Sequence, residues 1–118
     1  MSTLSTAAKN AAIDAVTALL DAGSGAASGS LVLMTAASAE VASIVLSNPA
    51  FAAASGGSAT ANSTTADTTT TAGTVTQYKA VNRDGTTVWT GDVSELTLTT
   101  AVYGTGDTAT LTSWTLSI

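Results

Sequence analysis

Residues 74–100 read TVTQYKAVNRDGTTVWTGDVSELTLTT, and this stretch decides the fold class. Two segments rich in β-branched and aromatic residues, 74–81 and 86–93, flank Asn82-Arg83-Asp84-Gly85. The Asp-Gly pair tolerates the positive φ of a tight turn, so the pattern predicts a β-hairpin. Residues 95–100 then alternate leucine with threonine, which is typical of a strand with one buried face.

Further strands are predicted on both sides of this hairpin. Residues 31–35 and 41–47 are short apolar runs that read as buried strands. In the last run, 108–118, the apolar phase changes, which indicates a bulge near Thr112 or Ser113. The threonine-rich segment 63–73 reads as an exposed loop or edge. The expected fold class is mainly β, an antiparallel β-sandwich of jelly-roll type with an N-terminal α-helix.

Residues 3–22 read as that helix. Ser2 or Ser5 supplies the N-cap, the interior is rich in alanine, and Gly23 stands where a C-cap glycine is expected. An apolar stripe follows the helical period, and we expect it to pack while the opposite face is wet. The stripe comprises Leu4, Ala8, Ala12, Val16 and Leu20, flanked by Ile13 and Leu19, and the opposite face carries Asn10, Asp14, Thr17 and Asp21.

The domain organisation follows from these elements. Residues 1–29 form the helix and a linker, residues 30–118 form the β-sandwich, and together they make a single structural domain. Aromatic residues are only 4% of the chain, so its core consists mostly of small aliphatic side chains. Such side chains bury little apolar area, and we therefore expect contacts between subunits to add to stability.

Composition excludes several functions. The chain has no histidine, no cysteine and only three basic residues, with a net charge of −5. This balance gives no electrostatic footprint for nucleic acid or for an anionic membrane. The apolar runs are far shorter than the roughly 20 residues of a membrane span, and residues 1–12 lack the pattern of a signal peptide. We expect a soluble, unprocessed protein.

Acidic residues are the remaining candidates for chemistry. Asp92 and Glu95 are the only close carboxylate pair outside the helix, and their spacing favours a solvated turn over a catalytic pair. Calcium would accept oxygen ligands from Asp84, Asp92, Glu95 or Asp107, but no EF-hand spacing is present. The glycine pair in residues 55–58 lacks the Gly-Lys-Thr ending of a phosphate loop. We therefore expect no enzyme activity, no cofactor and no metal.

The aromatic residues suggest contact instead. Trp114 lies in phase with Leu116 and Ile118, so it is assigned to the core. Trp89 alternates with threonine and glycine, which favours an intersubunit contact over a sugar-stacking platform. The candidate interface residues are Leu4, Ala8, Ile13, Val16, Leu20 and Trp89.

Three ordered segments carry a family resemblance. They are SNPAF at 47–51 followed by ASGG at 54–57 and ATAN at 59–62, then DGTTV at 84–88 with Gly91, and finally ELTLTT at 95–100 leading to Asp107-Thr108 and TSWT at 112–115. With the alanine-rich helix in front, they resemble a family of small tailed-bacteriophage virion proteins of β-sandwich type. The chain departs from that family at LVLM, residues 31–34, and at Gln77-Tyr78, which points to a different binding surface.

This resemblance implies a non-enzymatic virion component that carries no catalytic residues. Its most plausible role is a capsid decoration or cement protein on the outside of the phage head, made in the host cytoplasm. The partners would be the major capsid protein and further copies of the chain, with a trimer suited to threefold positions of an icosahedral shell. The alternative is a glycan-binding or adhesin module of a tail fibre that uses Trp89 and Tyr103.

Overall fold

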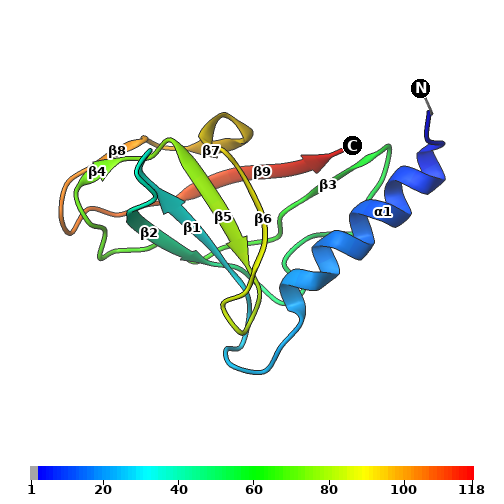
Figure 1. The fold of residues 1–118 in the computed structure, drawn as a ribbon, viewed down its shortest axis with the longest axis horizontal. Helices are drawn as coiled ribbons and strands as arrows, with labels where there is room; N and C mark the ends of the chain where they lie inside the picture. The colour runs from blue at the N-terminus through cyan, green and yellow to red at the C-terminus, as the bar shows by residue number, and fades with distance from the viewer. Residues whose placement is uncertain (1–2) are drawn as a thin grey trace.

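The computed structural model of the protein describes residues 3–118 and shows a mainly β fold with antiparallel sheets and one N-terminal helix. This confirms the coarse fold class expected from the sequence. The helix lies at one end of the molecule, and the small ribbon of strands β4, Gly73–Thr74, and β8, Val102–Tyr103, lies at the other (Figure 1). The chain ends close to the start of the helix, because Ile118 N–H donates to the Gly57 carbonyl, and a Cβ on Gly57 would meet the Lys9 side chain.

The helix α1, Thr6–Ala18, continues into a 3₁₀ turn, η1, Leu19–Asp21. Ser5 is its N-cap, and the Ser5 hydroxyl accepts a hydrogen bond from Ala8 N–H at 3.1 Å. The other candidate cap, Ser2, lies outside the described residues. After the 3₁₀ turn, Gly23 adopts a φ of 109°, in the region that favours glycine, and the chain turns into the linker.

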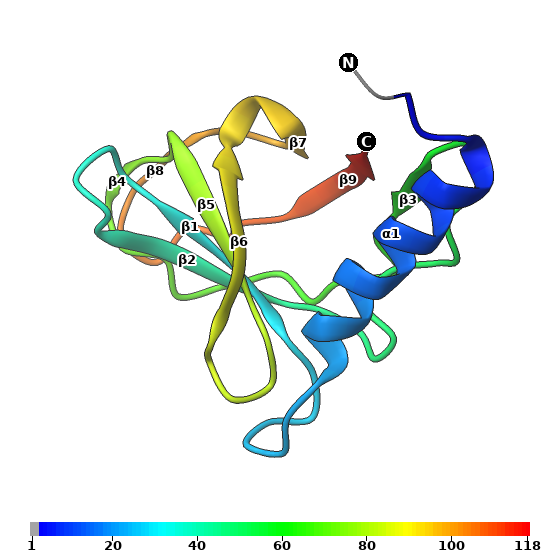
Figure 2. The same ribbon diagram turned by 45° about the vertical axis from the view of Figure 1, so that its right-hand side comes forward.

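Four strands form the larger sheet in the order β2-β1-β5-β6 (Figure 2). They are β1 Ser30–Met34, β2 Glu40–Val45, β5 Gln77–Val81 and β6 Thr87–Asp92. Strands β5 and β6 are the predicted hairpin, and Gly85 at its turn has a φ of 81°. The register of this hairpin leaves Val88 as an extra residue of β6, which is a β-bulge.

Three strands form a second sheet in the order β3-β9-β7. They are β3 Ser58–Thr60, β7 Leu96–Leu98 and β9 Leu111–Ser117, with a short 3₁₀ turn, η2 Val93–Glu95, before β7. Leu98 pairs with Leu111 and Thr97 with Ser113, so Thr112 is the bulge that the change of phase predicted. Leu111 and Trp114 are consequently both buried. The remaining strands, β4 Gly73–Thr74 and β8 Val102–Tyr103, form the ribbon.

The threonine-rich segment 63–73 is mostly outside regular strands, as expected, but it runs along the outer edge of β2. Thr65 N–H donates to the Val45 carbonyl, and Thr71 N–H donates to the Val41 carbonyl. Between them, the Asp67 carboxylate accepts from Ser43 N–H at 2.8 Å. This segment therefore satisfies the edge of β2, which would otherwise be open to pairing with another chain.

One buried cluster unites the helix and the sheets. Ile13 and Leu20 have no exposed area, and they belong to the same cluster as Leu31 and Trp114. The expectation that the apolar stripe of α1 packs as a whole is wrong: Leu4 and Leu19 are about half exposed, and Thr17 of the supposed wet face is buried. The physical reason is that the inward face of α1 is fixed by hydrogen bonds as well as by apolar contact.

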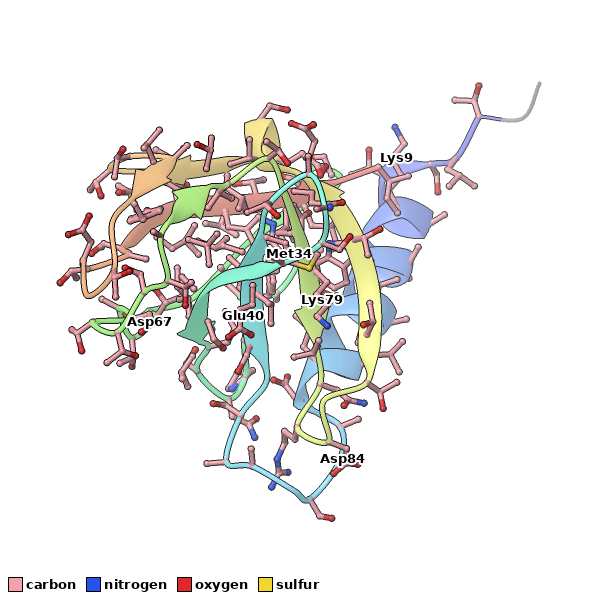
Figure 3. All side chains as sticks on the ribbon, turned by 60° about the vertical axis from the view of Figure 1, so that its left-hand side comes forward. Lys9, Met34, Glu40, Asp67, Lys79 and Asp84 are labelled. Carbon is pink, nitrogen blue, oxygen red and sulfur yellow. The ribbon has the colours of Figure 1, made fainter. Side chains whose placement is uncertain are left out.

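A second, smaller cluster lies on the other face of the four-stranded sheet. Val32, Met34 and Val81 form it, on strands whose alternate residues Leu31 and Leu33 point into the main core. Met34 pairs in register with Glu40 across β1 and β2, and Figure 3 shows both beside Lys79 of β5. This face is thus a mixture of apolar and charged side chains.

Candidate contact surface

The polar side of α1 docks onto the segment between Ala50 and Gly57. Asn10 Oδ1 accepts from Gly57 N–H at 2.9 Å, and Asp14 Oδ1 accepts from Ala54 N–H at 2.8 Å. About two turns further along, in η1, Asp21 Oδ1 accepts from the N–H of the fully buried Ala50 at 2.9 Å. The helix rises 1.5 Å per residue, so acceptors several residues apart on one side can each reach a successive N–H group of an extended chain that runs beside the helix. These three side chains therefore hold α1 in place.

The opposite side of α1 faces solvent and is apolar. Leu4 is 47% exposed and Leu19 is 52% exposed. We call this surface the outer α1 face. Its exposed members are Ala8, Ala11, Ala15 and Ala18 of α1, together with Leu4 before the N-cap and Leu19 in η1. None of these residues is charged.

The candidate interface residues of α1 thus separate into two groups. Leu4 and Ala8 lie on the outer α1 face, and Val16 is half-buried at its margin. Ile13 and Leu20 lie wholly in the core and offer no surface to a partner. A contact through α1 would therefore use the alanine side of the helix.

Trp89 is part of an aromatic cluster inside the molecule. Its ring centroid lies 5.4 Å from that of Trp114 and 6.1 Å from that of Phe51. Trp89 Nε1 donates to the Tyr78 hydroxyl at 3.1 Å, and that hydroxyl donates to Glu95 Oε1 at 3.2 Å. Trp89 is half-buried, whereas Trp114 is only 1% exposed, as expected for a core residue.

The position of Trp89 follows from the hairpin register. Trp89 pairs with the buried Ala80, and Gly91 pairs with Tyr78, so both lie on the core face of β6. A Cβ at Gly91 would lie 2.6 Å from the Tyr78 ring, so this glycine provides space for an aromatic side chain. The bulge at Val88 shifts Thr87 out of this alternation, which is why the Thr-Trp-Gly pattern suggested a more exposed tryptophan.

Asp92 and Glu95 are the two halves of a capping box for η2. Asp92 Oδ1 accepts from Ser94 N–H at 2.8 Å, and Glu95 Oε1 accepts from Asp92 N–H at 3.1 Å. The Ser94 N–H bond lowers the pKa of the exposed Asp92 carboxyl. Burial raises the pKa of the Tyr78 hydroxyl, and the nearby negative charge of Glu95 adds to this rise. The pair therefore organises a turn, in line with the solvated-turn interpretation.

Most of the carboxylates accept hydrogen bonds from backbone N–H groups. Of the 8 acidic residues, seven accept such a bond: Asp14, Asp21, Asp67, Asp84, Asp92, Glu95 and Asp107. Several of these bonds join segments far apart in sequence, in a chain with long irregular stretches. The acidic residues therefore act mainly by stabilising the fold through hydrogen bonds to the backbone.

In two of these carboxylates, Asp84 and Asp67, the hydrogen bonds lower the pKa. Asp84, at the hairpin tip (Figure 3), accepts from Ser24 N–H and Gly25 N–H of the linker, and these bonds lower its pKa. Burial alone would raise the pKa of Asp67, but bonds from Ser43 N–H and Thr69 outweigh it, and the pKa is lowered. Both carboxylates are stabilised in the charged form.

The calcium candidates are dispersed among these structural roles. Asp84 fastens the hairpin tip to the linker, and Asp107 accepts from Gly104 N–H at 2.7 Å in a separate turn. Across residues 3–118, no three acidic side chains gather closely enough to hold a metal ion. Within the same residues, no helix has the length and apolar character needed to cross a bilayer.

A groove of about 260 Å³ lies between residues 61–64 and residues 111–114. Its walls carry the amide of Asn62 and hydroxyls such as those of Ser63 and Thr112, and no charged residue lines it. This volume is below the roughly 300 to 1,000 Å³ of typical ligand pockets. The groove arises where β9 bulges, and it lacks the acid, base or nucleophile pairs that catalysis needs.

Trp89 and Tyr103, the aromatic pair considered for glycan binding, do not share an exposed surface. Tyr103 is only 4% exposed, and its hydroxyl is buried with no hydrogen-bond partner among the described residues. Burial raises the pKa of this hydroxyl. Trp89 contributes to the aromatic cluster, so the two side chains form no common platform for a sugar ring.

The sequence matches no protein-family model, no curated protein and no solved structure. The functional argument therefore depends on the chain itself.

The sequence pattern did not identify the residues that position the outer α1 face. Asn10, Asp14 and Asp21 were assigned to a wet face because they are polar. The available signal was their spacing: three short acceptors recur on one side of a helix, and the later segment 50–57 is too irregular to satisfy its own N–H groups.

Proposed function

We propose that this chain is a non-enzymatic structural protein of a tailed-phage virion, most specifically a decoration protein on the outer surface of the head. Its partners are the major capsid protein and further copies of itself. The protein is made in the host cytoplasm and then added to the particle. Its task is to stabilise the shell by contact.

The observation that carries this proposal is the contrast between the carboxylates and the outer α1 face. Seven of the 8 acidic residues fasten the backbone, so they are already engaged in holding the fold. The outer α1 face is apolar, exposed and free of charge. A chain with its reactive groups engaged and an apolar surface exposed is suited to contact with other proteins.

The proposal extends to the arrangement of the sheets. We propose that the four-stranded and three-stranded sheets stack as a sandwich of jelly-roll type around the aromatic cluster. Tyr78 of β5 and Trp114 of β9 support this arrangement, because their rings meet edge to face at a centroid distance of 5.5 Å. Contacts of this kind join the inner faces of two packed sheets.

Many copies on a regular lattice would make such contacts effective. Each outer α1 face is small, but attachment at several points multiplies weak affinities. The net charge of −5 keeps the unassembled chain soluble. The fibre-borne glycan-binding alternative gains no comparable support, because Tyr103 is buried and Trp89 is packed against Phe51 and Trp114.

The test is to locate the protein on purified particles. Antibody raised against the chain should label the whole head, and quantitative proteomics of the same particles should find many copies per head. Label confined to the tail tip would refute the decoration role. A second assay adds the purified chain to undecorated shells, and co-sedimentation that saturates with concentration is the expected result.

A further inference from the structure

The tip of the β5–β6 hairpin, where Figure 3 labels Asp84, carries the only aspartate of the chain that glycine follows. The backbone nitrogen of the next residue can attack an aspartyl side chain. Glycine favours this attack, because it has no Cβ to crowd the nitrogen or to restrict the backbone. Asp84 and Gly85 are both exposed, so the tip presents a chemically reactive peptide bond to solvent.

In the folded chain the Asp84 carboxylate lies against the linker between η1 and β1. Its Oδ1 accepts hydrogen bonds from Ser24 N–H at 3.0 Å and from Gly25 N–H at 2.8 Å. A Cβ on Gly23 would lie 2.6 Å from Asp84 Oδ2, and a Cβ on Gly25 would lie 3.1 Å from Oδ1. Glycine at these two positions lets the carboxylate approach the backbone, where successive N–H groups bind the negative charge. We call Gly23, Ser24 and Gly25 the linker cradle.

The attacking nitrogen is held as well. Gly85 N–H donates to the Asn82 carbonyl at 3.0 Å, which closes the turn. Asn82 Oδ1 accepts from Asp84 N–H and from Thr86 N–H, each at 3.0 Å. Attack requires the nitrogen to give up its proton and the carboxyl group to turn out of the linker cradle. The reaction therefore needs the closed tip to open first.

We propose that Asp84 is a site of isoaspartate formation and that the linker cradle controls the reaction. In the opened tip the Gly85 nitrogen attacks Cγ of the protonated Asp84 carboxyl group. A C–N bond forms, the carboxyl hydroxyl leaves with the proton of the nitrogen as water, and a succinimide ring results. Water then adds to the ring. Breaking the bond from the nitrogen to the Asp84 backbone carbonyl carbon gives isoaspartate, and breaking the bond to Cγ restores aspartate.

The product does not fit the closed tip. Isoaspartate lengthens the backbone between residues 84 and 85 by one methylene group, and its free carboxylate is attached directly to Cα. A longer turn and a shorter carboxylate match neither the Gly85 bond to Asn82 nor the linker cradle. Arg83 Nε still donates to the Ala26 carbonyl, but this bond is exposed and holds the linker alone. Isomerisation thus loosens the linker that joins the helical segment to the larger sheet.

The first experiment measures isomerisation in the complete chain, folded in buffer and unfolded in urea, at neutral pH and physiological temperature. Cleavage after Lys79 releases a peptide in which chromatography separates the two forms at residue 84. Only the opened fraction reacts, so the folded chain should form isoaspartate at least about tenfold more slowly than the unfolded chain.

Gly25→Ala separates the linker cradle from the turn. Its Cβ would crowd both Asp84 Oδ1 and the Arg83 carbonyl, while the sequence around Asp84 stays unchanged. This variant should isomerise several-fold faster than the unmodified chain when folded and at the same rate in urea. Gly104→Ala is the matched control and should behave like the unmodified chain. Far-UV circular dichroism verifies that both variants are folded.

Amide hydrogen exchange supplies a readout that does not depend on reaction rates. Exchange at Ser24 and Gly25 should be faster in the purified isoaspartate form than in the aspartate form, because the acceptor of both N–H groups is lost.

Four outcomes would overturn the inference. Isoaspartate absent from residue 84 even in urea would refute the site, and equal rates in buffer and in urea would refute protection by the fold. Gly25→Ala no faster than Gly104→Ala would assign the protection to the turn alone. Unchanged amide exchange in the isoaspartate form would show that the linker stays attached. None of these measurements involves a capsid, so this inference and the proposed function stand or fall separately.

Discussion

The Asp21 carboxylate and the Ala50 backbone N–H are joined by a hydrogen bond of 2.9 Å, although 29 residues separate them in sequence. Ala50 is fully buried, so its N–H has little access to water. The bond ties the end of the helical segment to the chain that leads into β3. Together with the burial of Ile13 and Leu20, it fixes which side of α1 faces inward and which side faces solvent.

We expect Asp21→Ala to lower the free energy of unfolding by about 1 to 3 kcal/mol, because it leaves a buried N–H without an acceptor. Asp21→Asn keeps an oxygen at this position and should cost less. Asp14→Ala should also cost less, since Ala54 N–H lies in an exposed bond that water can replace. Urea denaturation measures all three, and equal losses would contradict the burial argument.

Gly91→Ala should destabilise the protein by about 1 to 3 kcal/mol through overpacking. The added methyl group would lie 2.6 Å from the Tyr78 ring and also against Glu95. Gly104→Ala is the matched control, because the atom nearest to its added methyl group, in the Asp107 side chain, lies 3.4 Å away. Thermal unfolding of the two variants should differ clearly, and similar melting temperatures would show that Tyr78 can move aside.

Loss of the hydroxyl should affect the free energy of unfolding differently at Tyr78 and at Tyr103. Tyr78→Phe removes an acceptor for Trp89 Nε1 and a donor to Glu95, and should cost about 1 to 2 kcal/mol. Tyr103→Phe removes a buried hydroxyl that has no partner among the described residues, and should be neutral or stabilising. Chemical denaturation compares them, with tryptophan fluorescence reporting the change beside Trp89. A large loss for Tyr103→Phe would reveal a hydrogen bond to its hydroxyl.

Stability should fall in acid. The pKa values of Asp67, Asp84 and Asp92 are lowered in the folded state relative to about 3.9 in the unfolded chain. A lowered carboxyl pKa contributes stability that is present above the unfolded value and lost as pH falls through the folded value. The free energy of unfolding should therefore rise as the pH increases from below the folded pKa values to above the unfolded value of about 3.9. Asp67→Asn should flatten this rise, and an unchanged slope would contradict the assignment.

Stability should also fall in strong base. The pKa values of Tyr78 and Tyr103 are raised above their usual value of about 10, with burial as the main cause. A raised pKa gives stability that is complete below the unfolded value and lost as pH rises through the folded value. Absorbance at the tyrosinate band should titrate late in the folded chain and normally in urea. Normal titration of both tyrosines in the folded chain would refute this prediction.

Local patterns were sufficient for most strands and turns. The hairpin at Asp84-Gly85, the bulge at Thr112 and the core position of Trp114 all follow from residues close together in sequence. Turn propensity and side-chain alternation act over a few residues, so these features could be predicted without knowledge of the partners. The same holds for the capping role of Ser5.

The orientation of α1 and the position of Trp89 could not be predicted in this way. The orientation of α1 depends on a residue distant in sequence, because Ala50 supplies the N–H that Asp21 accepts. The core-facing position of Trp89 depends on the cross-strand register, in which it pairs with Ala80. Alternation predicts a face only where the register is regular, and the bulge at Val88 breaks it.

The sequence by itself determined a mainly antiparallel β protein with one N-terminal helix, because hydrophobic periodicity and turn chemistry are local properties. Only the tertiary structure decided that Ile13, Thr17 and Leu20 of the helical segment face inward while its alanine side faces solvent. The physical reason is that the irregular segment around Ala50 and Ala54 needs hydrogen-bond acceptors, and Asp21 and Asp14 supply them. Ala50 is fully buried and depends on the Asp21 acceptor, whereas the Ala54 bond is exposed, and the alanine side of the helix is left facing solvent.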